Sequence, residues 1–416
     1  MTNLTKLYCG VTQPADHLRY GQGQGAPRTA AERKPIVVWN ITRRCNLSCI
    51  HCYSDSDARF YPGELDLGQC KAVVDDLAAF QVPAVLLSGG EPMVHPHFYE
   101  LATYAREKGL RLTLSTNGTL IDHEAAEKIK KIGFAYVGIS LDGIGETHDY
   151  FRGKKGAFAK AVEAFRNCKA VGQKVGLRLT LSRNNIEDLE RILDFIETEG
   201  IERVCFYHLV FSGRGANLVD VEPARTRDAL DKILARTARW VAAGQNREVL
   251  TVDQPADGAY LYLRLLRERP EQAQAVYDLL AWNGGGANGS GIGLANIDTQ
   301  GNVHPDQFWQ TLTLGNVKER PFSEIWRDNS HPILAGLRNR LPLLKGRCGG
   351  CRFIKICGGG FRVRAVQVHG DPWAPDPGCY LTDEEIGWKG GPAAPVVPAV
   401  AGEGGELGGR LPFSCT

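Results

Sequence analysis

The chain has 416 residues, 43% of them hydrophobic, which is enough for about two to three folded domains with real cores. Its 49 Lys and Arg residues nearly balance its 47 Asp and Glu residues, so the net charge points neither to a nucleic-acid partner nor to an anionic membrane surface. No apolar stretch approaches the roughly 20 residues that span a bilayer, and no signal-peptide pattern begins the chain, so we expect a cytoplasmic protein without a membrane segment.

The first predicted unit, residues 1–34, is an N-terminal arm that ends in the Gly- and Gln-rich stretch Tyr20–Gly25. From residue 35 to 221, short apolar runs alternate with helix-like runs of crossover length. The predicted strands are Ile36–Ile41, Ala84–Ser88, Arg111–Thr116, Tyr136–Leu141, Gly176–Leu181 and Val204–Val210. Apolar strands with little alternation are typical of parallel strands buried on both faces, so we predict an α/β fold with a partial (β/α)6 barrel.

The second half, residues 222–389, is predicted to be a helical linker followed by a smaller domain. The pattern is helical from Glu222 to Leu280, becomes Gly-rich from Gly284, and contains a hairpin signal at Leu294–Val303. Residues 390–416 consist largely of Gly, Pro and Ala and bury too little surface to fold, so we predict a disordered tail there.

Three cysteines, Cys45, Cys49 and Cys52, follow the first predicted strand in one loop. Chemistry in βα barrels lies at the carboxyl ends of the strands. Three thiolates on one loop can hold three corners of a 4Fe-4S cube and leave the fourth iron open. An open iron can chelate S-adenosylmethionine (SAM), and an electron passed through the cluster then produces a 5'-deoxyadenosyl radical. A structural zinc knuckle with His51 as fourth ligand is the alternative.

The run Cys45-Asn46-Leu47-Ser48-Cys49-Ile50-His51-Cys52 resembles the signature of the radical SAM superfamily. Further motifs of that family follow in order at the predicted strand ends: Gly89-Gly90-Glu91-Pro92, Ser115-Thr116-Asn117-Gly118 and Ser140-Leu141-Asp142-Gly143. The resemblance implies that the backbone of the first motif binds the methionine amino group of SAM. It also implies that Ser115, Asn117, Ser140 and Asp142 line the ribose and methionine parts.

Two further side chains are candidates for the cofactor site. His51 occupies a position where the family commonly has an aromatic residue near the adenine, and a plain packing role is equally compatible with the sequence. Arg178 lies on the predicted strand Gly176–Leu181 and would pair with a carboxylate of cofactor or substrate if it faces the barrel mouth.

A second cysteine group, Cys348, Cys351, Cys357 and Cys379, supplies four thiolates, enough to close another 4Fe-4S cluster with no open iron. A zinc ribbon is the alternative that this spacing allows. The region resembles the SPASM or twitch extension of radical SAM enzymes, in which seven cysteines usually serve two auxiliary clusters.

The chain departs from that pattern at three ligand positions, which are taken here by Asn288, Asp306 and Phe361. The resemblance therefore predicts one auxiliary cluster, and so two 4Fe-4S clusters in all. The remaining cysteines, Cys9, Cys70, Cys168, Cys205 and Cys415, are expected to be structural. Cys9 is the exception to consider, because an arm folded over the active site would bring it there.

Several phrases resemble the tetrapyrrole-modifying radical SAM enzymes of the alternative haem pathway and of haem d1 synthesis. They include Leu7-Tyr8-Cys9-Gly10, Phe206-Tyr207-His208-Leu209, Ser212-Gly213-Arg214-Gly215, Asp306-Gln307-Phe308-Trp309, and Cys379-Tyr380-Leu381-Thr382-Asp383-Glu384-Glu385. Three segments are more similar to the haem branch: Lys6–Gly10, Thr251-Val252-Asp253 and Ala256-Asp257-Gly258. That branch removes acetate side chains from didecarboxysiroheme to give Fe-coproporphyrin III. The haem d1 branch, which removes propionates, is the alternative.

Two other functions compete with these. A SPASM peptide maturase would carry a peptide-recognition domain before the barrel, and 34 residues are too few to form one. A non-catalytic iron-sulfur or zinc scaffold would have damaged cofactor motifs, whereas the motifs of this chain are intact.

An iron-tetrapyrrole substrate needs cationic clamps for its carboxylates, aromatic walls and an axial ligand for its iron. The candidate side chains are Arg214, Arg362, Arg364, Phe308, Trp309, His208 and His304. Solvated arginines and structural histidines are the alternative interpretation of these residues. The chemistry also implies an electron donor of the reductase or ferredoxin type.

Overall fold

A computed structural model describes residues 1–14, 16, 20, 34–284 and 289–390 of the chain. Nearly all of the tail predicted at 390–416 therefore lies outside the described residues. No helix in the described part is long and apolar enough to cross a membrane.

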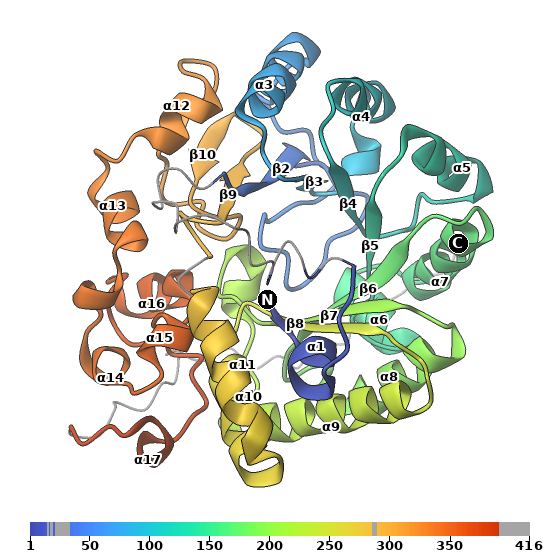
Figure 1. Cartoon of the computed structure of the whole chain (residues 1–416). Helices are drawn as coiled ribbons and strands as arrows, with labels where there is room; N and C mark the ends of the chain where they lie inside the picture. Colours follow the sequence, from blue (N-terminus) through green and yellow to red (C-terminus); the bar gives the residue numbers. More distant parts are fainter. Residues whose placement is uncertain (15, 17–19, 21–33, 285–288, 391–416) are drawn as a thin grey trace, which may run out of the picture.

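The predicted parallel strands form the middle of one curved sheet that surrounds the centre of the molecule (Figure 1). Its order is β1-β8-β7-β6-β5-β4-β3-β2-β9-β10-β11. The strands are β1 (Thr2–Asn3), β2 (Ile36–Thr42), β3 (Val85–Gly89), β4 (Leu112–Thr116), β5 (Tyr136–Ser140), β6 (Val175–Leu181), β7 (Arg203–His208), β8 (Glu248–Val252), β9 (Leu294–Ile297), β10 (Asn302–His304) and β11 (Gly315–Asn316). Strands β2 to β8 pair in parallel with one another, and β9 joins β2 in parallel.

Helices cover the outer face of the sheet and form most of the C-terminal region (Figure 1). They are α1 (Leu4–Cys9), α3 (Leu67–Phe80), α4 (Phe98–Glu107), α5 (His123–Ile132), α6 (Glu146–Arg152), α7 (Ala157–Ala170), α8 (Leu189–Thr198), α9 (Pro223–Ala242), α10 (Ala256–Glu268), α11 (Pro270–Trp282), α12 (Phe322–Arg327), α13 (Pro332–Arg338), α14 (Gly346–Gly349), α15 (Ile354–Cys357), α16 (Arg362–His369) and α17 (Asp383–Ile386). Short 3-10 helices are η1 (Pro92–Val94), η2 (Ile186–Asp188), η3 (Gly213–Asn217) and η5 (Leu341–Leu343).

Local sequence explains where the barrel helices begin and end. Helix α3 starts at a capping box in which Asp66 accepts a hydrogen bond from Gln69 N, while the Gln69 side chain accepts one from Asp66 N. Helix α5 is capped by Asp122 and ends at Gly133 in the left-handed conformation. The apolar faces of such helices pack on the strands, and the core contains Trp39, Phe98 and Phe165. This packing fixes the positions of the loops at the carboxyl ends of the strands.

Strand β8 was missing from the prediction. The segment between Glu222 and Leu280 was expected to be helical, but β8 lies inside it, fully buried and parallel to β7. A strand of five residues between two long helices has too short a pattern to stand out from its neighbours. Because β8 and β9 extend the sheet on both sides, the barrel sheet continues past residue 221. The hairpin signal at Leu294–Val303 is confirmed by the antiparallel pairing of β9 with β10.

The N-terminal arm packs along β8 and α9. Strand β1 pairs antiparallel with β8, and the Thr5 hydroxyl donates to Arg247 O at 2.6 Å and accepts from Val249 N at 3.0 Å. The arm thereby covers the open edge of β8. Cys9 ends α1 beside Arg269, half-buried, and is not among the residues that line the main cavity.

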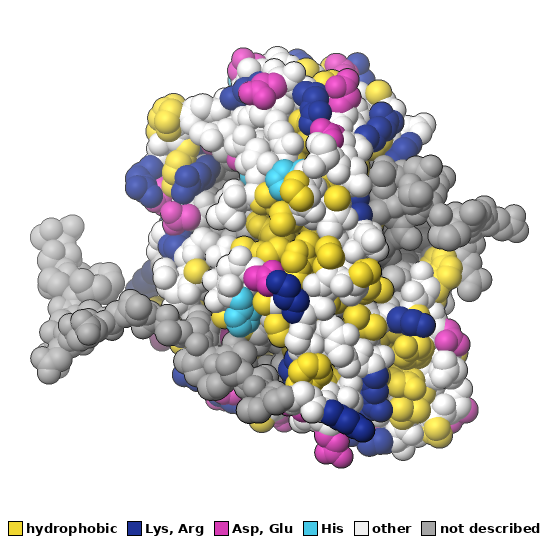
Figure 2. Space-filling view, turned by 90° about the vertical axis from the view of Figure 1, so that its left-hand side faces the viewer, with side chains coloured by type: hydrophobic (Ala, Val, Ile, Leu, Met, Phe, Trp, Pro, Cys, Tyr) yellow, Lys and Arg dark blue, Asp and Glu magenta, His cyan; other side chains and the backbone are white. Residues whose placement is uncertain are grey.

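The C-terminal region, which includes α12 to α16, occupies one flank of the barrel (Figure 1). Seen from that flank, hydrophobic side chains gather near the middle of the surface and charged side chains lie scattered around them (Figure 2).

Candidate functional site

A cavity lies at the carboxyl ends of the parallel strands. It brings together most of the residues that the sequence predicted for the cofactor site: Cys45, Cys49, His51, Cys52, Gly89, Gly90, Ser115, Asn117, Ser140, Asp142 and Arg178. Tyr207, His208, Asp253, Gln307 and Phe308 line it as well. Residues far apart in the sequence meet here because parallel strands end on the same side of the sheet.

The three cysteines of the first group lie on one loop with free thiols. Each sulfur is near a hydrogen-bond donor: Leu47 N lies 3.4 Å from Cys45 Sγ, Arg152 Nη1 3.4 Å from Cys49 Sγ, and Ser56 N 3.4 Å from Cys52 Sγ. Donors of this kind stabilise the negative charge of thiolates that bind iron.

Burial disfavours the ionised form of these thiols unless a positive charge lies nearby. It raises the pKa of Cys45 to about 12, and it raises the pKa of Cys49 as well. Iron would supply the charge that keeps both groups deprotonated. No three His, Cys, Asp or Glu side chains in the described ranges are placed to hold a single metal ion. Three thiols on one loop, each with a hydrogen-bond donor near its sulfur, are the donor set that a 4Fe-4S cluster with one open iron requires.

The loop Gly89-Gly90-Glu91-Pro92 packs directly on the cysteine loop. Gly90 N donates to Thr42 O at 2.8 Å, and Glu91 N donates to Arg44 O at 2.9 Å. Gly89 has a φ of +136°, and a Cβ on Gly90 would lie 2.3 Å from Arg44 O. Only glycine allows this close approach of the two backbones.

Glu91 and Pro92 do not line the cavity. The fully buried Glu91 carboxylate accepts hydrogen bonds from Thr116 Oγ1 at 2.8 Å and from Asn117 N at 2.8 Å. Burial raises the pKa of Glu91 to about 7. Glu91 therefore connects the end of β3 to the end of β4 through these hydrogen bonds, and Pro92 is the first residue of η1.

Arg152, at the end of α6, was missed by the sequence analysis. Its guanidinium contacts Cys49 Sγ and forms an ion pair with the Asp142 carboxylate, which also accepts from Thr180 N at 2.9 Å. Although burial opposes ionisation, the charge of Arg152 holds the pKa of Asp142 below its usual value. A buried cation thus faces the cysteine loop, and no local pattern distinguishes this arginine from a solvated one.

His51 lies beside this ion pair. Its Nε2 is 3.5 Å from an Asp142 oxygen, and its ring contacts Phe151 edge-on with centroids 5.2 Å apart. Burial lowers the pKa of His51 to about 4, so its ring is neutral near pH 7. The ring lines the cavity, and its contact with adenine stays a prediction.

Arg178 faces the cavity. Its guanidinium lies over the ring of Tyr207, 4.7 Å from the centroid. Gly138 on the neighbouring strand leaves room for it, because a Cβ there would lie 2.6 Å from Arg178 Cδ. Pairing of Arg178 with a carboxylate stays a prediction, which its position allows.

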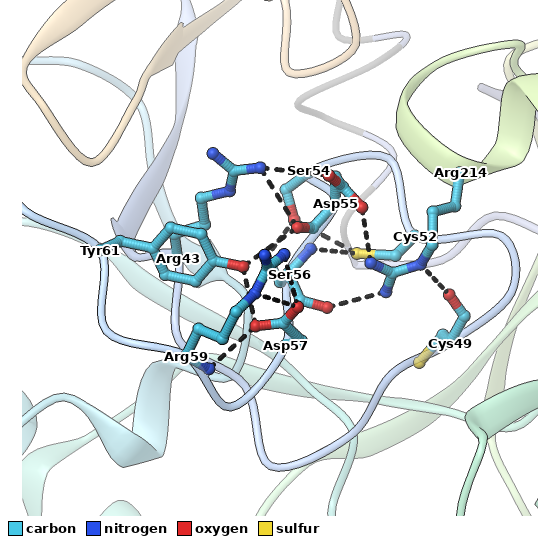
Figure 3. Close-up of polar contacts among 10 residues, drawn as sticks. All are labelled: Arg43, Cys49, Cys52, Ser54, Asp55, Ser56, Asp57, Arg59, Tyr61 and Arg214. Carbon is cyan, nitrogen blue, oxygen red and sulfur yellow. Dashed lines mark hydrogen bonds and ion pairs between the residues drawn. The ribbon is translucent and has the colours of Figure 1, made fainter.

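Arg214 binds the loop that carries Cys49 and Cys52 (Figure 3). Its Nε donates to Cys49 O at 2.8 Å, Nη1 to Asp55 Oδ1 at 2.7 Å and Nη2 to Ser56 O at 2.7 Å. Its backbone N donates to Cys52 O at 2.9 Å. Arg214 was predicted to bind a substrate carboxylate. In the structure its guanidinium instead donates hydrogen bonds to the cysteine loop from all three nitrogens.

Three other substrate candidates also lie away from the cavity. Arg362 donates from Nη1 to Ala374 O at 2.6 Å, and Arg364 forms an ion pair with Asp376 at 2.9 Å. Both arginines are completely buried, and Trp309 is buried in a separate apolar cluster. The expectation that these side chains face the substrate is therefore not met in the structure. A sequence pattern cannot distinguish an arginine that binds groups of its own chain from one that is free to bind a ligand.

Phe308 and His208 do line the cavity. The ring of Phe308 meets that of Tyr53 edge-on with centroids 5.2 Å apart, and Phe308 O accepts from Ser212 Oγ at 2.9 Å. His304, in contrast, is buried, with Nδ1 2.8 Å from Leu312 O and Nε2 3.3 Å from Asp298 Oδ2.

Asp253 is a further cavity residue that the sequence analysis did not select. It follows β8 with a φ of +65°, which is unusual for a residue other than glycine. Its Oδ2 is buried without a hydrogen-bond partner. Burial raises the pKa of Asp253 to about 6. The charges that act on Asp253 are those of the N-terminal amino group, Arg364, Asp306 and Arg178.

The second cysteine group also comes together, at a small pocket lined by Cys348, Cys351, Cys357 and Cys379. Asp376 N lies 3.3 Å from Cys348 Sγ, and Phe353 N lies 3.3 Å from Cys351 Sγ. Burial raises the pKa of Cys348 to about 11 and raises that of Cys357 well above its usual value. These four thiols fit a closed cluster for the same reasons as the first group.

The positions that depart from the seven-cysteine pattern carry other interactions. Asp306 is buried and accepts from Phe308 N at 2.8 Å and from Trp309 N at 3.1 Å, while Phe361 packs in an apolar cluster. Asn288 lies outside the described residues.

Comparison with known proteins agrees with this site. The model of the radical SAM superfamily matches residues 39–196. The chain is 51% identical to Fe-coproporphyrin III synthase of Methanosarcina barkeri, over 93% of this chain and 99% of that protein. It is 46% identical to pre-heme d1 synthase of Dinoroseobacter shibae, over 85% of this chain and 88% of that protein. The solved structure of native anSMEcpe with bound AdoMet has the same fold, with a TM-score of 0.64 at 18% identity, over 85% of this chain and 96% of that chain.

Replacing Arg214 by Ala should loosen the cysteine loop. Hydrogen bonds from a charged group contribute about 1.5–3 kcal/mol, so amide exchange in residues 49–56 should accelerate about tenfold or more. Arg214→Lys should rescue little, because a single ammonium cannot replace three directed N–H groups. Hydrogen-deuterium exchange with mass spectrometry measures both variants. Arg183→Ala, which removes an exposed arginine paired with Glu222, is the control. Unchanged exchange in Arg214→Ala would show that the loop is held by other contacts.

Replacing Asp253 by Asn should change how stability depends on pH. Because the pKa is raised from 3.8 to about 6, the protonated carboxyl stabilises the fold at low pH, and this contribution is lost as the pH rises through 6. Asn tolerates the left-handed backbone and carries no charge. The variant should match the wild type near pH 4 and exceed it at pH 8 by about 1–3 kcal/mol in the free energy of unfolding. Urea unfolding at both pH values tests this, with the exposed Asp228→Asn as control. A difference that does not depend on pH would contradict it.

Proposed function

The chain belongs to the radical SAM superfamily, and on that premise we propose that it removes acetate side chains from didecarboxysiroheme to give Fe-coproporphyrin III. Membership of the superfamily implies SAM and one 4Fe-4S cluster as cofactors. The observation that carries the proposal is the 51% identity to Fe-coproporphyrin III synthase over 99% of that protein. The cavity that brings together Cys45, Cys49 and Cys52 with the loop Gly89–Gly90 is in keeping with it.

The chain's own residues perform three tasks in the proposed reaction. Cys45, Cys49 and Cys52 hold the cluster, while Arg152 and Arg214 fix the loop that carries them. When bound, the cluster and SAM supply a carbon radical that can abstract a hydrogen atom from a substrate side chain. The protein then has to position the substrate and exclude water and oxygen.

The substrate side of the cavity is suited to a flat macrocycle with carboxylates. Tyr207, Leu209, Val210 and Phe308 give it apolar and aromatic walls. Among the described residues, none makes a hydrogen bond to the Arg178 guanidinium, which leaves its N–H groups available for a substrate carboxylate. The electron donor is, in our proposal, a reductase or a ferredoxin-type protein.

The haem d1 branch is the second candidate. The 46% identity to pre-heme d1 synthase, over 88% of that protein, favours it. That branch would remove propionates in place of acetates, so the two candidates differ in the mass of the product.

We further propose that Cys348, Cys351, Cys357 and Cys379 hold a second 4Fe-4S cluster that relays electrons. Replacing Cys357 by Ala should lower the iron content from about eight to about four per chain and leave one EPR signal that responds to SAM. Cys168→Ala, which alters a buried cysteine on α7, should keep all the iron. An unchanged iron count in Cys357→Ala would refute this ligand set.

Anaerobic reconstitution followed by incubation with SAM, dithionite and didecarboxysiroheme tests the function. We expect 5'-deoxyadenosine and a tetrapyrrole that has lost two acetate units, both measured by mass spectrometry. The triple variant in which Cys45, Cys49 and Cys52 are Ala should form neither product. Loss of propionates would identify the haem d1 branch, and deoxyadenosine with an unchanged tetrapyrrole would contradict both candidates.

A further inference from the structure

We propose that His208 is the axial ligand of the substrate iron, and that Asp257 and Tyr380 hold its ring in place for this purpose. The inference rests on the proposed function, because it requires a substrate that carries iron. It adds a specific bond between protein and substrate at one named atom, Nδ1 of His208.

His208 is the last residue of β7, and its side chain lines the cavity. Its Nε2 lies 3.0 Å from Asp257 Oδ2. Asp257 is fully buried in the first turn of α10, and its other oxygen accepts from the Tyr380 hydroxyl at 2.7 Å. The Tyr380 ring stacks on the His208 ring, with 9° between their planes and 6.5 Å between their centroids.

This arrangement is the one that metal-binding histidines use. A ligating imidazole almost always donates its second N–H to a carboxylate, which fixes the tautomer and makes the ligating nitrogen more basic. The Asp257 carboxylate places the proton on Nε2 and so leaves the lone pair on Nδ1. Nδ1 has no hydrogen-bond partner among the described residues, and it is not one of their buried unpartnered atoms. It is therefore accessible to a ligand.

The other candidate histidines lack this combination. Both ring nitrogens of His304 face acceptors of the chain itself, at Leu312 O and Asp298. The ring of His51 lines the cavity, but its Nδ1 is buried and its Nε2 faces Asp142. Among these three histidines, His208 alone offers a nitrogen to the cavity and holds a carboxylate with the other.

The bond would orient the substrate. An axial ligand fixes the macrocycle perpendicular to the Fe–N bond, and four of the remaining iron positions are filled by the tetrapyrrole nitrogens. His208, the cysteine loop, Arg178 and Phe308 line the same cavity, so an iron bound by His208 would bring the macrocycle beside all of them.

Binding of two porphyrins to the reconstituted protein tests the inference without turnover. The probes are ferric Fe-coproporphyrin III and metal-free coproporphyrin III, studied anaerobically by EPR and visible absorption. The oxidised clusters are EPR-silent, so the ferric signal reports the axial ligand. The wild type should give a nitrogen-ligated ferric signal that the metal-free probe cannot produce.

The variants His208→Ala and His208→Gln should lose that signal and bind Fe-coproporphyrin III about tenfold or more weakly, with little change for the metal-free probe. Gln can keep a hydrogen bond to Asp257, so it controls for a loss of packing. Added imidazole should restore the ferric signal in His208→Ala. Asp257→Asn should shift the signal without abolishing it, and His97→Ala, on an exposed side chain, should behave as the wild type.

An unchanged ferric signal in both His208 variants would overturn the inference while leaving the proposed function intact. An equal loss of affinity for both probes would overturn it too, because His208 would then act through packing alone. A wild type that binds neither porphyrin would refute the proposed function, and the inference with it.

Discussion

The anchoring of one irregular loop is the constraint on which the rest of this structure depends. Three thiols on residues 45–52, two of them buried and one partly buried, have to keep their directions without help from a helix or a strand. Hydrogen bonds with three neighbouring segments fix the loop. Gly90 and Glu91 donate backbone hydrogen bonds to the residues before it, Ile50 N donates to Phe151 O at 3.0 Å, and Arg214 binds its second half. Each contact comes from the end of a different βα unit, so the barrel has to be complete before the loop is rigid.

The electrostatics of the cavity follow from the same constraint. Buried thiolates are stable only beside positive charge, and the chain places Arg152 against Cys49 and Arg214 against the carbonyl oxygens of the loop. Carboxylates then balance the arginines, as Asp142 does for Arg152 and Asp55 does for Arg214. Arg178 stacks on Tyr207, and one buried oxygen of Asp253 has no hydrogen-bond partner among the described residues.

Patterns that depend on a few neighbouring residues were predictable from the sequence, and features set by packing were not. The six apolar strands and the motifs after them are local signals, so the barrel was predicted correctly, and most residues proposed for the cofactor site line one cavity. Strand β8 was missed because five residues between long helices carry too short a period. Arg152, Arg214, Arg362 and Arg364 look alike in a sequence, yet the structure turns each toward partners of its own chain. Asp253 was not selected because its special backbone and its unpartnered oxygen exist only in the folded chain.

The segment that follows β7 links the two cysteine groups and the substrate wall. His208 ends the strand, Leu209 O accepts from Arg364 Nη1 at 3.4 Å, and Arg214 binds the first cysteine loop. Arg364 in turn pairs with Asp376, whose backbone N lies against Cys348 Sγ of the second group. Residues 208–214 therefore contain both the proposed iron ligand and the arginine that binds the first cysteine loop. The buried ion pair of Arg364 with Asp376 connects this segment to the second cysteine group. In the proposed reaction, this segment would set the separation between an iron-bound substrate and the source of the radical. That separation would decide which side chain of the macrocycle reacts.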